Sequence, residues 1–437
     1  MTSLGPKPPI GILAGNGSLP GEIARAITAG GGGVQIVAID NEVDDDLSAF
    51  PIVHLGLGKI GAILQTFRAA GVQELIIVGG VTRPDLAKLR PDWGLFANLP
   101  EVARLVFSGG DDGVLRIVVR FFEAKGFTVV SPADVVPSLT VRAGSLTAAA
   151  PTPADIADIL LGSSVVKALG AYDIGQAVIV CDGELLAIEA AEGTDRMLAR
   201  VAQSRVARQT AKPHGVLVKR PKPGQEMRID LPAIGPATVT RAAAAGLAGI
   251  AVLAGQSLAA QRLQLLANAR AANVFVYGFT EGDEPPRNRA DTGWTNARAE
   301  AAGKHCPRSS QLADIRLGAA ALASLAALTR GGACVVSRGH ILGLEPAGDI
   351  GDLFQRTQRL QQWGIARLRR RASVAVLADG AAVNEATIAA ANAVNLSGIA
   401  VAGRQPVRAD VIRAADAAGL FVVQLTPALL SSTEHSS

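Results

Sequence analysis

The C-terminal part of the chain repeats an earlier segment, and this repeat restricts the possible folds more than any other feature. Asp314–Gly318 (DIRLG) resembles Asp158–Gly162 (DILLG), and Gly339–Glu345 (GHILGLE) resembles Gly183–Glu189 (GELLAIE). Both pairs of segments are separated by the same number of positions. Self-similarity at a constant offset indicates a duplicated folding unit. We therefore predict that the last domain is a second copy of the domain before it.

The copy differs from the original mainly in its polar residues. Glu345 and Asp379 match Glu189 and Asp230, but the lysine-containing run Lys219–Gln225 has no counterpart. We interpret the last domain as a degenerate copy that is structural or imitates a dimer. A second working site is the alternative interpretation.

The composition is that of a folded protein with aliphatic cores. The chain has 437 residues, 49% of them hydrophobic and only 4% aromatic, and this length predicts two or three domains. The net charge of +4 comes without the aromatic-studded basic patches typical of nucleic-acid binders. No apolar run approaches the ~18 residues of a membrane span, and the N-terminus has no apolar signal core. We expect a cytoplasmic protein that binds no nucleic acid, and weak contact with an acidic membrane surface stays open.

The three cysteines, Cys181, Cys306 and Cys334, stand far apart in the sequence. They form neither a metal-type spacing nor a disulfide framework, which indicates a reducing compartment. The histidines, among them His214, are isolated and share no ligand spacing. We expect structural rather than catalytic roles for them.

Short apolar runs alternate with helical patterns in the first part of the chain. Strands are expected at Pro9–Ala14, Val34–Ile39 and Glu74–Val78, and a helix is expected at Lys59–Ala70. This alternation predicts βαβ units and a parallel sheet. A later polar stretch without periodicity is too long for an ordinary loop. We predict an α/β protein with a Rossmann-like N-terminal domain (1–150), a second α/β domain (151–281), a linker (282–311) and the degenerate copy (312–437).

Two glycine loops follow predicted strands in the N-terminal domain. Residues 15–18 (GNGS) stand between a strand and a helix, and Gly79 and Gly80 follow another strand. Backbone N–H groups at such a helix start bind anions. Pro20 replaces the third glycine of a dinucleotide fingerprint, but Asp40 stands where a ribose-binding acid is expected. We predict a nucleotide or sugar site; an ordinary turn is the alternative.

Two adjacent aspartates, Asp111 and Asp112, begin the next long helical pattern. A single aspartate at a helix start is usually a cap. Two like charges side by side favour a nearby cation or a cluster of donors. Both interpretations, cap and functional site, remain open at this position.

Acidic residues and lysines gather at the ends of apolar runs in the second domain. They are Glu189, Glu192, Asp195, Lys219, Lys222, Gln225 and Asp230. Pro221 and Pro223 stiffen the loop that carries the lysines. Acids and lysines at strand ends are what phosphate chemistry with a divalent ion requires. The pattern predicts a phosphoanhydride hydrolase; solvated acids at a helix start and a surface hairpin are the alternatives.

Six segments, in order, resemble one family, the LpxI-type UDP-2,3-diacylglucosamine pyrophosphatases of lipid A synthesis. They are GILAGNGSLP near the start, GLGKIG (56–61), VGGVTRPD (78–85), GDDGVLR (110–116), AIEAAEGTDRML (187–198) and KRPKPGQEMRIDLPAIG (219–235). The resemblance implies a cytosolic two-domain enzyme working at the inner membrane face. It also implies Mg²⁺-dependent cleavage of UDP-2,3-diacylglucosamine into UMP and 2,3-diacylglucosamine 1-phosphate. The C-terminal copy is a departure, because the family ends near the predicted linker.

The residue pattern and the resemblance together assign roles to individual side chains. Catalytic roles are expected for Asp230, Lys219, Lys222 and Gln225. The expected ligands of Mg²⁺ are Asp230, Glu192 and Asp195. Substrate binding is expected from Gly15, Asn16, Gly17, Ser18, Gly79, Gly80, Asp111, Asp112, Glu189 and Thr194.

Two other functions stay open. The glycine loop and Asp40 favour a nicotinamide-dependent oxidoreductase, although Pro20 and the absence of an obvious hydride-transfer site argue against it. The eroded copy favours a non-catalytic nucleotide-sugar-binding scaffold. For assembly, we expect a monomer in which the copy takes the place of a partner subunit, or else a homodimer.

Overall fold

The computed structural model describes residues 7–39, 47–81, 111–208, 213–282, 297–326, 332–346, 350–358, 360, 372–378, 383–403 and 405–426. The chain divides into two compact units. The first compact unit comprises Met1–Ala150, Gly224–Thr240 and Val252–Thr280. The second compact unit comprises Pro151–Pro223, Arg241–Ala251 and Glu281–Ser437.

The N-terminal domain is built on a five-stranded sheet in the order β3-β2-β1-β4-β5. Its strands are β1 (Ile10–Ala14), β2 (Val34–Ile39), β3 (Ile52–Leu55), β4 (Glu74–Val78) and β5 (Thr128–Val129). Every neighbouring pair is parallel. The predicted Rossmann-like parallel sheet is thereby confirmed.

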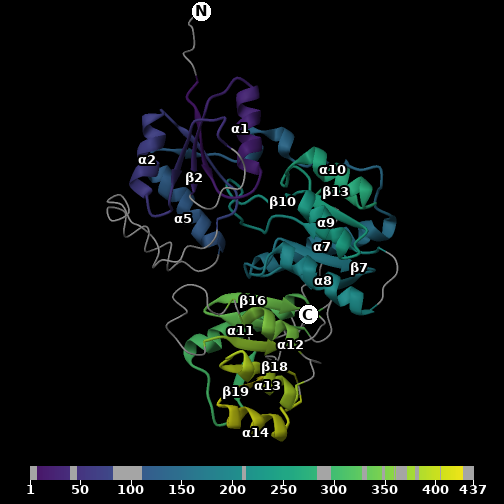
Figure 1. Cartoon of the computed structure of the whole chain (residues 1–437). Coiled ribbons are helices and arrows are strands. Elements are labelled where there is room, and N and C mark those ends of the chain that lie inside the picture. The colour runs from purple at the N-terminus through teal and green to yellow at the C-terminus, as the bar shows by residue number, and fades with distance from the viewer. Residues whose placement is uncertain are drawn as a thin grey trace, which may run out of the picture. The chain divides into compact units, whose positions relative to one another are not determined.

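Helices cover both faces of this sheet (Figure 1), with α1 (Leu19–Ala29) on one face and α2 (Ile60–Ala69) and α5 (Asp111–Ala124) on the other. Alternate residues of each strand therefore enter different cores. On the α1 face, Ile12 and Ile36 pack with Ile23. On the other face Phe67 and Phe127 form an edge-to-face pair with ring centroids 6.1 Å apart. A sheet buried on both faces explains why its strands are continuous apolar runs.

The next sheet has six strands in the order β6-β13-β11-β9-β7-β8. They are β6 (Gly144–Ser145), β7 (Ala177–Cys181), β8 (Glu184–Ile188), β9 (Val216–Lys219), β11 (Gly249–Leu253) and β13 (Phe275–Phe279). β7 is antiparallel to both β8 and β9. The accompanying helices are α7 (Pro153–Gly170), α8 (Thr194–Arg208), α9 (Pro236–Ala244) and α10 (Arg262–Ala271). A separate pair of short strands, β10 (Ala233–Ile234) and β12 (Leu258–Ala259), is parallel.

The third sheet has the order β14-β19-β18-β17-β15-β16, which repeats the preceding order strand for strand. The strands are β14 (Arg298–Ala301), β15 (Ala333–Ser337), β16 (His340–Glu345), β17 (Val374–Leu377), β18 (Gly398–Ala402) and β19 (Phe421–Thr426). Its helices are α11 (Ser309–Ser324), α12 (Ile350–Gln358), α13 (Glu385–Ala393) and α14 (Ala409–Ala418). This sheet includes β14, although the sequence pattern assigned those residues to the linker. The reason is that RAEA forms a mostly exposed edge strand, which carries no hydrophobic signal.

Local details repeat between the two copies as closely as the strand order does. β7 and β15 carry the same irregularity in register, between Ile179 and Val180 and between Val335 and Val336. A Cβ atom at Gly162 of α7 would stand 2.7 Å from a Val218 methyl group, and α11 has a glycine in the equivalent tight contact. These coincidences support the prediction that the last domain copies the one before it.

The two copies contact each other within the second compact unit, through α7 with α11 and β8 with β16. Arg200 of the first copy and Arg356 of the second each pair with both Glu192 and Glu345. We call these four residues the inter-copy ion cluster. Their side chains are largely buried, with exposed fractions of 8–14%.

Among the described residues, no helix combines the length and apolarity needed to cross a membrane.

Candidate active site

The two glycine loops meet at the C-terminal edge of the parallel sheet, beyond β1 and β4. Gly15 donates its backbone N–H to the Val78 carbonyl at 2.9 Å. Asn16 and Gly80 exchange backbone hydrogen bonds of 2.7 and 3.2 Å. The order β3-β2-β1-β4-β5 reverses between β1 and β4, and ligands of open α/β sheets bind where the strand order reverses.

Close backbone contact explains why glycine is needed in these loops. A Cβ atom at Gly15 would stand 2.3 Å from the Gly80 carbonyl oxygen, and one at Gly80 would stand 2.4 Å from Asn16 Oδ1. Gly79 has a φ of +96°, which favours glycine. Gly17 has a φ of +92° and open space beside it, so a ligand can approach its backbone.

The start of α1 is tied to a later segment of the same compact unit. Ser18 donates its hydroxyl to Glu22 Oε1 at 2.7 Å, and both Glu22 carboxylate oxygens accept from the Gln261 backbone N–H at 2.9–3.0 Å. Asp111 and Asp112 begin α5, but their side chains lie outside the description. Asp40 also lies outside the described residues.

Three predicted residues of the second compact unit form a hydrogen-bonded chain. Lys219, the last residue of β9, donates from Nζ to Thr194 Oγ1 at 2.9 Å. The Thr194 hydroxyl donates to Glu189 Oε1 at 2.9 Å. Glu189 Oε2 also accepts from the Gln176 backbone N–H. The carboxylate therefore holds the threonine, and the threonine orients a lysine that is only 7% exposed.

The loop after β9 is anchored by further ion pairs. Lys222 pairs with Asp173. Buried Arg220 donates to Ser163 Oγ at 2.9 Å and pairs with Glu281. The hydrogen bond from Arg220 lowers the pKa of the Glu281 carboxyl below its ordinary value. Sequence analysis selected Lys219 and Lys222 but not Arg220, which lies between them. Because Arg220 is buried, its charge needs a partner, and Glu281 provides it.

Gln225 and Asp230 belong to the first compact unit, whereas Lys219 and Lys222 belong to the second. The Gln225 side-chain amide donates to Asp230 Oδ2 and to the Asp230 carbonyl, both at 2.6 Å. Ile229 packs against the core that contains Phe67 and Phe122. Asp230 is therefore carried by a segment packed on the N-terminal domain, which its position in the sequence did not suggest.

A second anchor of this segment is Arg228, which pairs with Glu226 and with Glu123 of α5 at 2.6–2.7 Å. The hydrogen bond from Arg228 lowers the pKa of the Glu226 carboxyl, and Glu226 raises the pKa of the Arg228 guanidinium. Both groups are charged at neutral pH and fix the turn just before Asp230.

The two other predicted metal ligands are engaged by arginines. Glu192 belongs to the inter-copy ion cluster, and Asp195 pairs with Arg241 at 3.2 Å. Mg²⁺ is usually held by one or two carboxylates together with water and phosphate oxygens. The Asp230 carboxylate accepts from the Gln225 side-chain amide, and its oxygens are of the ligand type that Mg²⁺ prefers.

Comparison with known protein families agrees with the N-terminal domain and with the two copies that follow it. Residues 9–139 match the model of the LpxI N-terminal domain. Residues 142–277 and again 298–423 match the model of the LpxI C-terminal domain. The UDP-2,3-diacylglucosamine pyrophosphatase LpxI of Caulobacter vibrioides is 38% identical over 278 residues, which cover 63% of this chain and 99% of that relative. The double match confirms that the C-terminal domain is present twice.

Proposed function

The chain belongs to the LpxI family, and from this premise we propose that it is a UDP-2,3-diacylglucosamine pyrophosphatase of lipid A synthesis. The observation that carries the proposal is the match to both domain models together with the full-length match to the Caulobacter relative. In the proposed reaction a water oxygen forms a new bond to phosphorus and one bridging P–O bond breaks. The products are UMP and 2,3-diacylglucosamine 1-phosphate.

In the first compact unit, we assign nucleotide binding to the paired glycine loops. Backbone N–H groups and the N-terminus of α1 attract negative charge. Gly15, Gly79 and Gly80 leave no space for side chains between the loops. The loops also lie where the strand order reverses, which supports binding of the UDP moiety there.

In the second compact unit, we assign phosphoryl stabilisation to Lys219 and Lys222. Both side chains are less than a tenth exposed, and a charge acts more strongly where water is excluded. The chain through Thr194 and Glu189 sets the position of the Lys219 ammonium before substrate arrives. Preorganised charge of this kind lowers the barrier, because it needs no rearrangement during the reaction.

We propose that the Asp230 carboxylate accepts a proton from the attacking water, and that Gln225 holds this carboxylate in place. Mg²⁺, when bound, supplies positive charge that offsets the charge of the diphosphate. Asp230 is the residue we propose to hold it. Both roles depend on the Asp230 carboxylate being ionised.

Purified full-length protein tests the proposal directly. It should release UMP from UDP-2,3-diacylglucosamine in the presence of Mg²⁺, and EDTA should stop the release. Asp230→Asn should abolish turnover, whereas Asp410→Asn, which changes an aspartate paired with Arg408 in the third domain, should not. Substrate binding without UMP release would favour the scaffold, and saturable NAD(H) binding would favour the oxidoreductase.

Reaction in ¹⁸O-labelled water identifies the phosphorus that is attacked. The label enters UMP if water attacks the phosphorus next to the nucleoside. It enters 2,3-diacylglucosamine 1-phosphate if water attacks the phosphorus next to the sugar. If Lys219 only stabilises charge, Lys219→Met should slow the reaction while the ¹⁸O label still enters the same product.

The assembly we propose is a monomer in which the third domain covers the face that a second subunit would need. The contacts of α7 with α11 and β8 with β16 support it. Light scattering of the full-length chain should give the mass of one chain, and a stable dimer would contradict the proposal. We also propose a cytoplasmic enzyme with transient membrane contact, because its substrate is acylated; sedimentation with substrate-containing vesicles tests this.

A further inference from the structure

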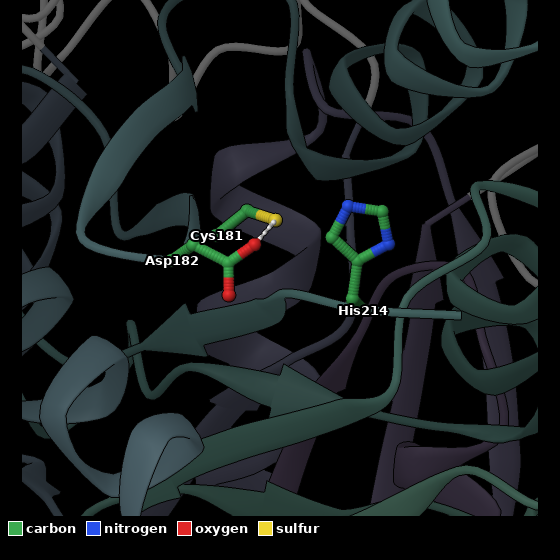
Figure 2. A group of neighbouring side chains, drawn as sticks. All are labelled: Cys181, Asp182 and His214. Atoms are coloured by element: carbon green, nitrogen blue, oxygen red, sulfur yellow. Dashed lines mark hydrogen bonds between the residues drawn. The ribbon is translucent and has the colours of Figure 1, made fainter. Parts of the chain in front are cut away.

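A thiol, a carboxylate and an imidazole come together in the second compact unit, away from the residues discussed above (Figure 2). Cys181 is the last residue of β7, Asp182 follows it, and His214 stands shortly before β9. One ligand atom from each lies within 4.8 Å of the other two. Within the described part of the chain, this is the one group of three potential metal ligands.

The backbone holds two of these residues in a defined turn. Asp182 has a φ of +52° and Gly183 a φ of +78°, as in the two-residue turns that join antiparallel strands. The buried Asp158 carboxylate accepts from both backbone N–H groups, at 2.9 and 2.7 Å. The backbone that carries the Asp182 side chain is therefore fixed by the fold.

His214 approaches the turn from the other side. Its backbone N–H donates to the Gly246 carbonyl at 3.0 Å, and the next residues form β9, which pairs with β7. Figure 2 shows the imidazole facing the Cys181 thiol and the Asp182 carboxylate. The thiol and a carboxylate oxygen are 3.6 Å apart.

We propose that Cys181, Asp182 and His214 bind a zinc ion, with a solvent molecule as the fourth ligand. Thiolate, imidazole and carboxylate are the groups that bind zinc, whereas Mg²⁺ prefers oxygen alone. Tetrahedral zinc with these ligands separates the donor atoms by about 3.3–3.6 Å. The observed donor atoms lie within 4.8 Å of one another, so zinc binding requires the side chains to rotate toward this spacing. Cys181 is buried and Asp182 is exposed, so the fourth position faces solvent.

This zinc site is separate from the candidate active site. In the antiparallel pair β7 and β9, Ala177 is opposite Lys219 and Val180 is opposite Val216. Lys219 therefore stands at one end of β9, and His214 precedes the other end. Five residues of extended chain span about 16 Å. The zinc links the β7–β8 turn to the segment entering β9 without contacting the predicted lysines.

The second copy provides an internal control. It keeps the same turn, in which Asp314 accepts from the Arg338 and Gly339 backbone N–H groups at 2.8 and 2.6 Å. The strand pairings place Ser337 and Arg338 at the positions of Cys181 and Asp182, and Ala372 at that of His214. The turn thus forms without any of the three ligands, so their presence in the first copy needs a reason other than the turn.

Zinc binding to the untagged full-length chain tests this proposal. After removal of metal with EDTA, titration of Zn²⁺ against a chromogenic chelator should give one equivalent per chain. Cys181→Ser and His214→Ala should each weaken binding by more than about 100-fold, because loss of outer partners alone costs 10–100-fold. Cys306→Ser, which removes an exposed thiol, should bind like the parent.

Co²⁺ gives a second measurement, because a cobalt–thiolate bond produces a charge-transfer absorption. The parent should show this band and Cys181→Ser should lose it. Asparagine tolerates the left-handed conformation at position 182, so Asp182→Asn should keep the fold. It should still lower the affinity for zinc. Absence of Zn²⁺ binding by the parent, or unchanged binding in the folded Cys181→Ser and Asp182→Asn variants, overturns the proposal; hydrolase activity decides nothing here.

Discussion

The second and third domains share one backbone design but differ in the side chains it carries. Asp158 and Asp314 clamp the same hairpin turn through equivalent pairs of backbone hydrogen bonds. The position of Lys219, opposite Ala177, is taken in the copy by Leu377, opposite Ala333. The groups that hold the backbone have been kept and the lysine has not. If Lys219 acts as proposed, folding and chemistry depend on separable sets of side chains in this domain.

One carboxylate has been kept but has acquired other partners. Glu189 accepts from the Thr194 hydroxyl and from a backbone N–H. Its counterpart Glu345 accepts from Arg356 and from Arg200 of the first copy. Glu189 is thus a residue of the candidate site, whereas its counterpart Glu345 belongs to the inter-copy ion cluster.

The largest expected effect concerns the inter-copy ion cluster. Loss of one partner from a buried ion pair leaves an uncompensated charge and costs ~3–5 kcal/mol. Arg356→Met should destabilise more than Arg200→Met, because Arg356 also pairs with Asp352 and donates to the Leu344 carbonyl. Chemical denaturation measures both.

The matched control for these arginines is Arg408→Met. Arg408 pairs with Asp410 on the surface, where its side chain is 72% exposed, and exposed pairs contribute ~0–1 kcal/mol. If Arg200→Met and Arg356→Met destabilise no more than Arg408→Met, the ion cluster does not hold the copies together.

The next effect concerns activity and depends on the proposed function. Lys219→Met should lower kcat by ~10²–10³-fold, the usual loss when one preorganised charge-stabilising group is removed. Leu377→Met, at the equivalent place in the copy, should change kcat less than twofold. Rates of UMP release give both values. A large loss in Leu377→Met instead would reveal a working site in the third domain.

A smaller effect is expected at the two turn clamps. Asp158→Ala and Asp314→Ala each leave two backbone N–H groups without their acceptor, which costs ~1–3 kcal/mol. Because the hydrogen-bond geometry is the same in both copies, the two losses should be similar. Thermal unfolding followed by circular dichroism compares them. A loss in only one copy would mean that the other copy no longer needs its clamp.

The smallest effect is a pH dependence shared by the clamps. Burial raises the pKa of both the Asp158 and the Asp314 carboxyls above the ordinary value of 3.8. Each folded carboxyl then binds its proton more tightly than the unfolded one. Its contribution to stability is complete below pH 3.8 and declines as pH rises through the raised pKa. Asp158→Asn and Asp314→Asn should flatten this decline, and unfolding midpoints at successive pH values measure it.

Much of the fold could be predicted from the sequence because its signals are local or repetitive. The strand Glu74–Val78 coincides with β4, since a short apolar run between polar residues is typical of a buried parallel strand. β14 was not predicted as a strand, because an exposed edge strand has no apolar pattern to recognise. The boundaries predicted for the domains stay predictions.

Of the residues predicted for the candidate site, the structure brings some together and places others with different partners. Lys219, Thr194 and Glu189 do come together. Glu192 pairs with two arginines, one of which is far along the chain. A carboxylate next to a helix start carries no sign in the sequence of which cation will reach it. Cys181 and His214 were set aside as isolated for the same reason.

The sequence by itself determined that the chain is an α/β protein of the LpxI type with a duplicated C-terminal domain. Motifs and repeats are recognised directly from the order of residues along the chain. Only the tertiary structure decided which charges meet. Asp230 packs with the N-terminal domain, Glu192 joins the contact between the copies, and a thiol meets an imidazole. Such pairings depend on strand order and on packing between distant segments, and the spacing of residues along the chain does not encode them.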